Sequence, residues 1–117
     1  ATAETLGAAA VVAMYELGLS SMKTMTSAQV GDKTMMDAMY PAIDAMKATI
    51  AANPGAALCD VYQNAADAAK AGAEKTAEYA AKFGRAKNLG ERSKGTQDAG
   101  ATSLALIFQA FADAAKN

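Results

Sequence analysis

Apolar residues recur at helical spacing in four segments of the chain, separated by short polar or glycine-containing stretches. The clearest pattern falls within residues 32–52, where the apolar positions follow at steps of three and four: Met36, Met39, Ile43, Met46 and Ile50. Asp32 is the predicted N-cap of this helix. Pro41 lies inside the pattern, and because the phase continues across it we predict one kinked helix rather than two pieces.

The other three helices are predicted from similar signals. Residues 3–23 are apolar nearly all round, which predicts burial between other helices. After the break at residues 53–55, a third helix is expected from about Ala57 to Phe83, ending at Gly84. Its heptad seam has small residues in the middle, which allow close helix approach. The fourth helix runs from about Asp98 or Ala101 to Ala115.

Each terminal helix has a predicted core face. For the first helix the apolar positions are Leu6, Val11, Met14 and Leu17. For the fourth they are Leu104, Ile107, Phe108 and Phe111. No strand is predicted, so residues 1–117 indicate one all-α domain, an antiparallel helix bundle or barrel.

Composition narrows the classes of function. The 117 residues carry 11 basic and 12 acidic side chains, no histidine and one cysteine. A histidine base, a histidine metal ligand and an internal disulfide are therefore excluded for this chain. No apolar run is long enough to span a membrane, and a reducing, cytoplasmic location is compatible with the single thiol. Positive charge is concentrated in one loop, which argues against a general nucleic-acid binder.

That loop covers residues 84–97 and is the first candidate site. Its four cations, Arg85, Lys87, Arg92 and Lys94, outnumber the single acid Glu91, and it contains three glycines. The loop leads into the predicted helix start at Asp98. A glycine-rich cationic loop before a helix N-terminus suits a polyphosphate, because free N–H groups and arginines both bind anions. The alternative is a solvated basic connector, with Asp98 acting only as an N-cap.

A second polar cluster covers residues 31–37, Gly-Asp-Lys-Thr-Met-Met-Asp. A glycine turn that opens a helix can face a nucleotide, with Met35 against the base. The alternative is a helix cap followed by a methionine core stripe. The three acids Asp32, Asp37 and Asp44 are too spread for a convincing Mg²⁺ site, and solvent-facing acids are the expected alternative.

Together the two clusters resemble the nucleotide-binding L subunit or L domain of dihydroxyacetone kinases. The matching stretches are VGDKTMMD at residues 30–37, the following Pro41-Ala42, and KFGRAKNLGERSKGTQDAGATS at residues 82–103. The second stretch is long and specific. The resemblance covers nearly the whole chain, whereas residues 1–29 match only in general character.

The resemblance implies an eight-helix antiparallel barrel that holds ADP or ATP with Mg²⁺ at one end. The L component supplies a phosphoryl group to dihydroxyacetone, which a separate K subunit or domain holds. In one version of the family, a phosphotransferase-system phosphocarrier rephosphorylates a resident ADP; in the other, ATP is the exchangeable donor.

The resemblance also implies roles for individual residues. Met35 is similar to the residue near the adenine, and Arg85 to the arginine that reaches the phosphates and assists transfer. Asp98, Ala99 and Gly100 are similar to the segment that lines the nucleotide pocket. Thr26 corresponds to a nucleotide-contact position, and at this position the family carries glycine instead of threonine.

The family's aspartate-rich magnesium loop and its glycine-rich phosphate turn are both missing from this sequence. Residues 1–117 therefore resemble the C-terminal half of the domain, about four of eight helices. We expect a kinase-type phosphotransferase that is incomplete alone, with its metal ligands on the N-terminal half or a second chain. The alternative function is a non-catalytic helical module that binds a nucleotide or docks a protein.

Overall fold

A computed structural model describes residues 7–25, 31–79 and 95–116 of the chain. They form four α-helices: α1 (Ala8–Lys23), α2 (Met36–Ala52), α3 (Leu58–Lys75) and α4 (Ala99–Ala115). A short 3₁₀ turn, η1 (Thr76–Glu78), follows α3. Within these ranges the structure is all-helical, without strands, as the sequence predicts. None of the described helices has the length and apolar character of a membrane-spanning segment.

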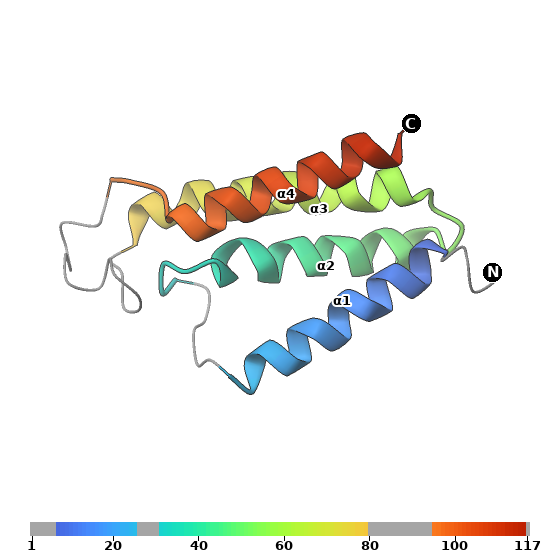
Figure 1. The fold of residues 1–117 in the computed structure, drawn as a ribbon, viewed down its shortest axis with the longest axis horizontal. Coiled ribbons are helices and arrows are strands. Elements are labelled where there is room, and N and C mark those ends of the chain that lie inside the picture. Colours follow the sequence, from blue (N-terminus) through green and yellow to red (C-terminus); the bar gives the residue numbers. More distant parts are fainter. Residues whose placement is uncertain (1–6, 26–30, 80–94, 117) are drawn as a thin grey trace.

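Consecutive helices run antiparallel, and α2, α3 and α4 lie side by side along the long axis of the molecule (Figure 1). Their shared core consists mainly of alanine, with a few large side chains. Phe108 of α4, Met46 of α2 and Val61 of α3 are the large members, each at most 1% exposed. Full burial of such a side chain contributes about 1.5–3 kcal/mol, so these few positions matter most to the core.

The helix α2 is continuous from Met36 to Ala52 and includes Pro41, which confirms the prediction of one helix across the proline. Proline has no N–H, so the carbonyl of Asp37, four residues earlier, has no helical donor. This carbonyl faces α3 at Gly72: a Cβ there would overlap the Asp37 oxygen and lie 3.1 Å from Pro41 Cγ. The predicted seam of small residues therefore sets the close approach of α2 and α3.

The third helix ends earlier than predicted. Instead of continuing to Phe83, α3 stops at Lys75, the 3₁₀ turn follows, and Tyr79 is extended. Two interactions at Thr76 explain this end: its hydroxyl donates to the Ala73 carbonyl at 2.5 Å, and its carbonyl accepts the N–H of Tyr79 at 3.1 Å. Residues 80–83 lie outside the described part of the chain.

The predicted core faces of α1 and α4 are partly wrong. On α4 the buried positions are Ala101, Ala105, Phe108 and Ala112. Ile107 and Phe111 are 48% and 43% exposed, because small residues turn a different stripe toward α3. On α1, Met14 and Leu17 face outward instead of joining the core. The helix α1 lies on one side of α2 and is not enclosed between helices (Figure 1).

Candidate functional site

Three segments distant in sequence meet at one end of the bundle, where α2 and α4 begin and α3 ends (Figure 1). We call this the junction, and define it as residues 31–35, 76–79 and 95–98. Hydrogen bonds connect its segments: the Gly95 N–H donates to the Ala77 carbonyl at 2.6 Å, and the Asp98 N–H donates to the Thr76 hydroxyl at 2.7 Å. The start of α4 is thereby fixed to the end of α3.

At the junction, two predicted site residues from separate clusters are neighbours. A Cβ placed on Gly100 would lie 3.3 Å from the Cβ of Met35 and 3.3 Å from Asp98 Oδ2. A side chain at this position would therefore press on Met35 and on the Asp98 carboxylate. Met35 itself is 38% exposed, so its thioether side chain is accessible beside the first turn of α4. The arrangement offers an apolar, polarisable surface next to backbone amides.

Asp98 begins α4 as its N-cap, as the sequence predicts. Its carboxylate accepts the Ala101 N–H at 2.9 Å, and its carbonyl accepts the Thr102 N–H at 3.0 Å. Ala99 and Gly100 are therefore the first-turn residues, whose N–H groups have no partner within the helix itself. Because the Asp98 carboxylate already brings a negative charge to this helix start, a phosphate would meet repulsion there.

Lys33 is a feature of the junction that the sequence did not predict. Its side chain is 3% exposed, and its ammonium donates to the Thr76 carbonyl at 2.5 Å and also to the Thr96 carbonyl. Its backbone has φ 62°, in the left-handed region that costs a non-glycine residue roughly 1–2 kcal/mol. Lysine is rarely buried without partners, and here two carbonyls from different segments are the partners.

Asp37 is also buried, at 1% exposed, so the expectation that it faces solvent is wrong. Its two oxygens accept the N–H of Gly31 at 2.6 Å and of Thr34 at 2.9 Å. The Thr34 hydroxyl in turn accepts the Met36 N–H at 3.1 Å, a reciprocal arrangement like a capping box. The helix starts at Met36, so the prediction of Asp32 as N-cap is wrong as well. Asp44, by contrast, is exposed.

Comparison with known proteins assigns the family. The sequence model of the DAK2 domain matches residues 1–113, which is nearly the entire chain. The chain belongs to the DAK2 domain family. This result confirms the family to which the sequence motifs pointed.

Several proteins named as kinases carry a segment similar to this DAK2 chain. The L-erythrulose 1-kinase of Mycolicibacterium smegmatis is 41% identical over 96 residues, which cover 82% of this chain and 16% of that protein. The dihydroxyacetone kinase of Citrobacter freundii is 40% identical over 105 residues, covering 88% and 17%. DhaL of Escherichia coli, the ADP-binding subunit of a PEP-dependent dihydroxyacetone kinase, is 35% identical over 103 residues, covering 88% and 48%. The chain thus spans about half or less of the length of these relatives.

Two of the predicted site residues of the DAK2 chain, Thr26 and Arg85, lie outside the described residues, as does most of the cationic loop, residues 84–94. Of the predicted site residues, the structure brings together Met35, Asp98, Ala99 and Gly100. That Thr26 and Arg85 belong to the same site stays a prediction. Among the residues that are described, no three acidic, histidine or cysteine side chains come together as a metal site.

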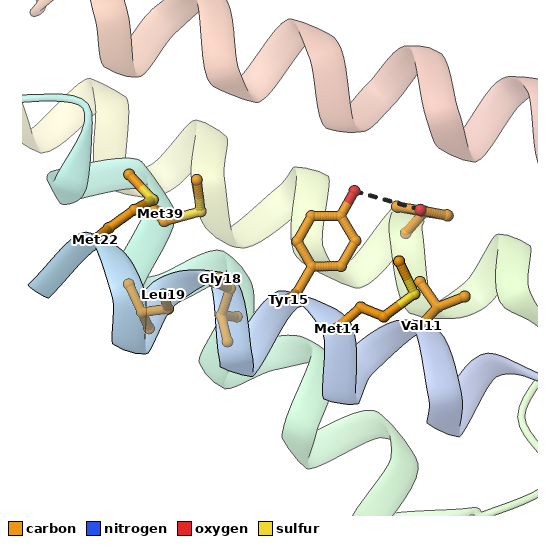
Figure 2. A pocket seen from close by; sticks show the side chains of 9 residues that line it. Val11, Met14, Tyr15, Gly18, Leu19, Met22 and Met39 are labelled. Carbon is orange, nitrogen blue, oxygen red and sulfur yellow. Dashed lines mark hydrogen bonds between the residues drawn. The ribbon is translucent and has the colours of Figure 1, made fainter.

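A separate hollow lies on the side of this DAK2 chain, between α1 and α2, and has a volume of about 380 Å³ (Figure 2). Its lining is almost wholly apolar and includes Met14, Leu19 and Met39, none of them a predicted site residue. Tyr15 borders it and forms a hydrogen bond of 3.3 Å with the hydroxyl of Tyr62. Burial, and then this hydrogen bond, raise the pKa of the Tyr15 phenol above its ordinary value.

Proposed function

We propose that this chain is the C-terminal half of a DAK2 domain and forms part of the adenine-nucleotide site of a dihydroxyacetone-type kinase. The observation that carries the proposal is the contact between Gly100 and Met35. It places side by side the two clusters that the family resemblance assigns to the nucleotide. The relatives named as dihydroxyacetone and erythrulose kinases, one of them an ADP-binding subunit, support the same function.

The geometry favours one orientation of the bound nucleotide. The thioether of Met35 is partly exposed beside the backbone of Gly100, and its polarisable sulfur suits the aromatic ring of the adenine. Asp98 can accept a hydrogen bond from a ligand hydroxyl or amine beside it. Since its carboxylate disfavours phosphate at this spot, we place the phosphates toward the cationic loop, with Arg85 as the residue that assists transfer.

The bound groups that the family implies are ADP or ATP and Mg²⁺. We propose Met35, Ala99 and Gly100 for the nucleoside, because Met35 lies against Gly100 in the first turn of α4. The described residues do not fit Mg²⁺, because both carboxylate oxygens of Asp37 already accept hydrogen bonds from backbone N–H groups. We propose that the metal ligands come from the N-terminal half of the domain or a second chain.

The proposed partners follow from the same reasoning. A half-domain needs a second half, and α1 presents Met14 and Leu17, 60% and 71% exposed, beside an apolar hollow. We propose that the missing helices cover this face. The acceptor is a small ketose held by a separate K subunit or domain in the cytoplasm, and dihydroxyacetone is the first candidate. Erythrulose is the second, because two of the relatives named for it are at least 41% identical to the chain.

The test uses the complete domain, meaning this chain with the segment that completes the barrel. We expect Mg²⁺-dependent binding of ADP or ATP in a calorimetric titration. We also expect phosphoryl transfer when the K component and dihydroxyacetone or erythrulose are added. Binding without transfer to either ketose would favour the non-catalytic module. A complete domain that binds neither nucleotide would overturn the proposal.

A further inference from the structure

We infer that Lys33 is a positioning residue for the nucleotide site: by tying together the three segments of the junction, it sets the spacing between Met35 and the start of α4. This inference rests on the proposed function for its consequence, although the contacts themselves are independent of any ligand. Lys33 is not placed against the nucleotide, because its side chain is 3% exposed and directed to backbone carbonyls.

The Lys33 ammonium connects two segments that are far apart in the sequence. One side chain reaches the carbonyls of Thr76 and Thr96, which stand 43 and 63 residues away in sequence. Thr76 ends α3, and Thr96 precedes Asp98 by two residues. A charged donor strengthens hydrogen bonds to carbonyls, and the bond to Thr76 is buried, where water does not compete for it. Lys33 therefore holds both segments against its own turn.

The second step links this connection to the predicted site. Thr76, whose carbonyl Lys33 binds, also accepts the Asp98 N–H through its hydroxyl at 2.7 Å. Asp98 in turn caps α4 at Ala101. Two residues after Lys33, Met35 lies against Gly100. A shift of the Lys33 side chain would thus act on both surfaces that face the nucleoside.

The third step concerns the backbone of Lys33. A left-handed conformation at a lysine persists only where surrounding contacts determine it, and such residues cluster at functional sites. Here the conformation turns the side chain inward while the flanking Asp37 carboxylate holds the N–H groups of Gly31 and Thr34. The turn is therefore fixed from both sides, which keeps Met35 in one place when no ligand is bound.

The test compares Lys33→Met, which keeps length and removes the donors, with Lys70→Met, the same change at an exposed position of α3. In the ligand-free complete domain, we expect the Asp98 and Ala101 amides to exchange with deuterium at least about tenfold faster in Lys33→Met only. Unchanged exchange would overturn the inference. This readout needs no nucleotide, so it is decided even if the wild-type domain binds none and the proposed function fails.

The second readout separates positioning from a purely structural role. We expect Lys33→Met to raise the KM for the nucleotide about tenfold and leave the KM for the ketose unchanged. In a double-mutant cycle with Met35→Ala, the two losses of nucleotide affinity should be clearly less than additive. Additive losses of nucleotide affinity in the cycle would overturn the inference. An equal rise in KM for the nucleotide and the ketose would overturn it as well. If Lys33→Met does not fold, Lys33→Gln, which shortens the side chain and removes its charge, takes its place in both measurements.

Discussion

Gly100 lies against Met35: a Cβ at position 100 would approach the Met35 Cβ to 3.3 Å, so Met35 would have to move by a few tenths of an ångström. These residues are 65 positions apart, and each belongs to a different one of the two motifs that point to the nucleotide. The contact depends on the junction, which brings the start of α2 and the start of α4 to the same end of the bundle.

The first prediction concerns Gly100→Ala in the complete domain. The added methyl presses on Met35, which we propose contacts the nucleoside, so we expect nucleotide affinity to fall about tenfold. Stability should change by no more than about 1 kcal/mol, because alanine favours the helix while the contact with Met35 is tight. Calorimetric titration and urea unfolding measure the two effects. Unchanged affinity would remove Gly100 from the site.

A second prediction concerns Gly72, where α3 lies against the Asp37 carbonyl of α2. A methyl at this position overlaps the Asp37 carbonyl, which belongs to rigid backbone, so Gly72→Ala should cost about 3 kcal/mol or more of unfolding free energy. The matched control is Gly18→Ala on α1, where a Cβ meets nothing within 4 Å. That change should stabilise by up to about 1 kcal/mol. Similar urea midpoints for both variants would contradict the close approach.

A third prediction separates the two roles of Asp98. Asp98→Ala removes the cap on Ala101 and should cost about 1 kcal/mol, whereas Asp98→Asn keeps a capping oxygen and should cost little. If the carboxylate also binds the nucleoside, both variants lose nucleotide affinity. Should Asp98→Asn bind nucleotide as well as the wild type, the charge of Asp98 has no part in binding.

A fourth prediction follows from the pair of tyrosines beside the apolar hollow. Because burial and the Tyr62 hydrogen bond raise the pKa of Tyr15, folding favours the neutral phenol. This contribution is full below the unfolded pKa of about 10 and is lost as pH rises above it. Urea unfolding should therefore show stability falling more steeply above that pH in the wild type than in Tyr15→Phe. Parallel curves would contradict the assignment.

Much of the fold is predictable from the sequence, because helical periodicity and capping residues act locally. The stripe on α2, the small-residue seam on α3 and the cap at Asp98 all depend on neighbours a few positions away. Periodicity does not say which of two apolar faces meets a partner. Ile107 and Phe111 belong to the predicted core face of α4, but they are partly exposed in the structure. The alanines of α4 are buried in their place.

The candidate site was predictable in part. The motifs identified Met35 and residues 98–100, which the structure places together. The burial of Lys33 and Asp37 was not predicted, because charged side chains are normally exposed. Lys33 is buried against carbonyls far away in sequence, and Asp37 against N–H groups that precede it in the chain. The partners of Lys33 lie 43 and 63 residues away, which no local pattern reveals. The local signal is limited to Lys33 and Thr34 directly after the glycine turn, with Asp37 three residues later.

The most direct test of the nucleotide site is the change in backbone amide NMR shifts when ADP and Mg²⁺ are added to the complete domain. We predict the largest shifts, within this chain, at Met35 and at residues 99–101, with smaller ones along α2 and α3. Shifts centred on residues 53–57 at the other end of the bundle, or saturable binding that leaves Met35 and Gly100 unaffected, would contradict it.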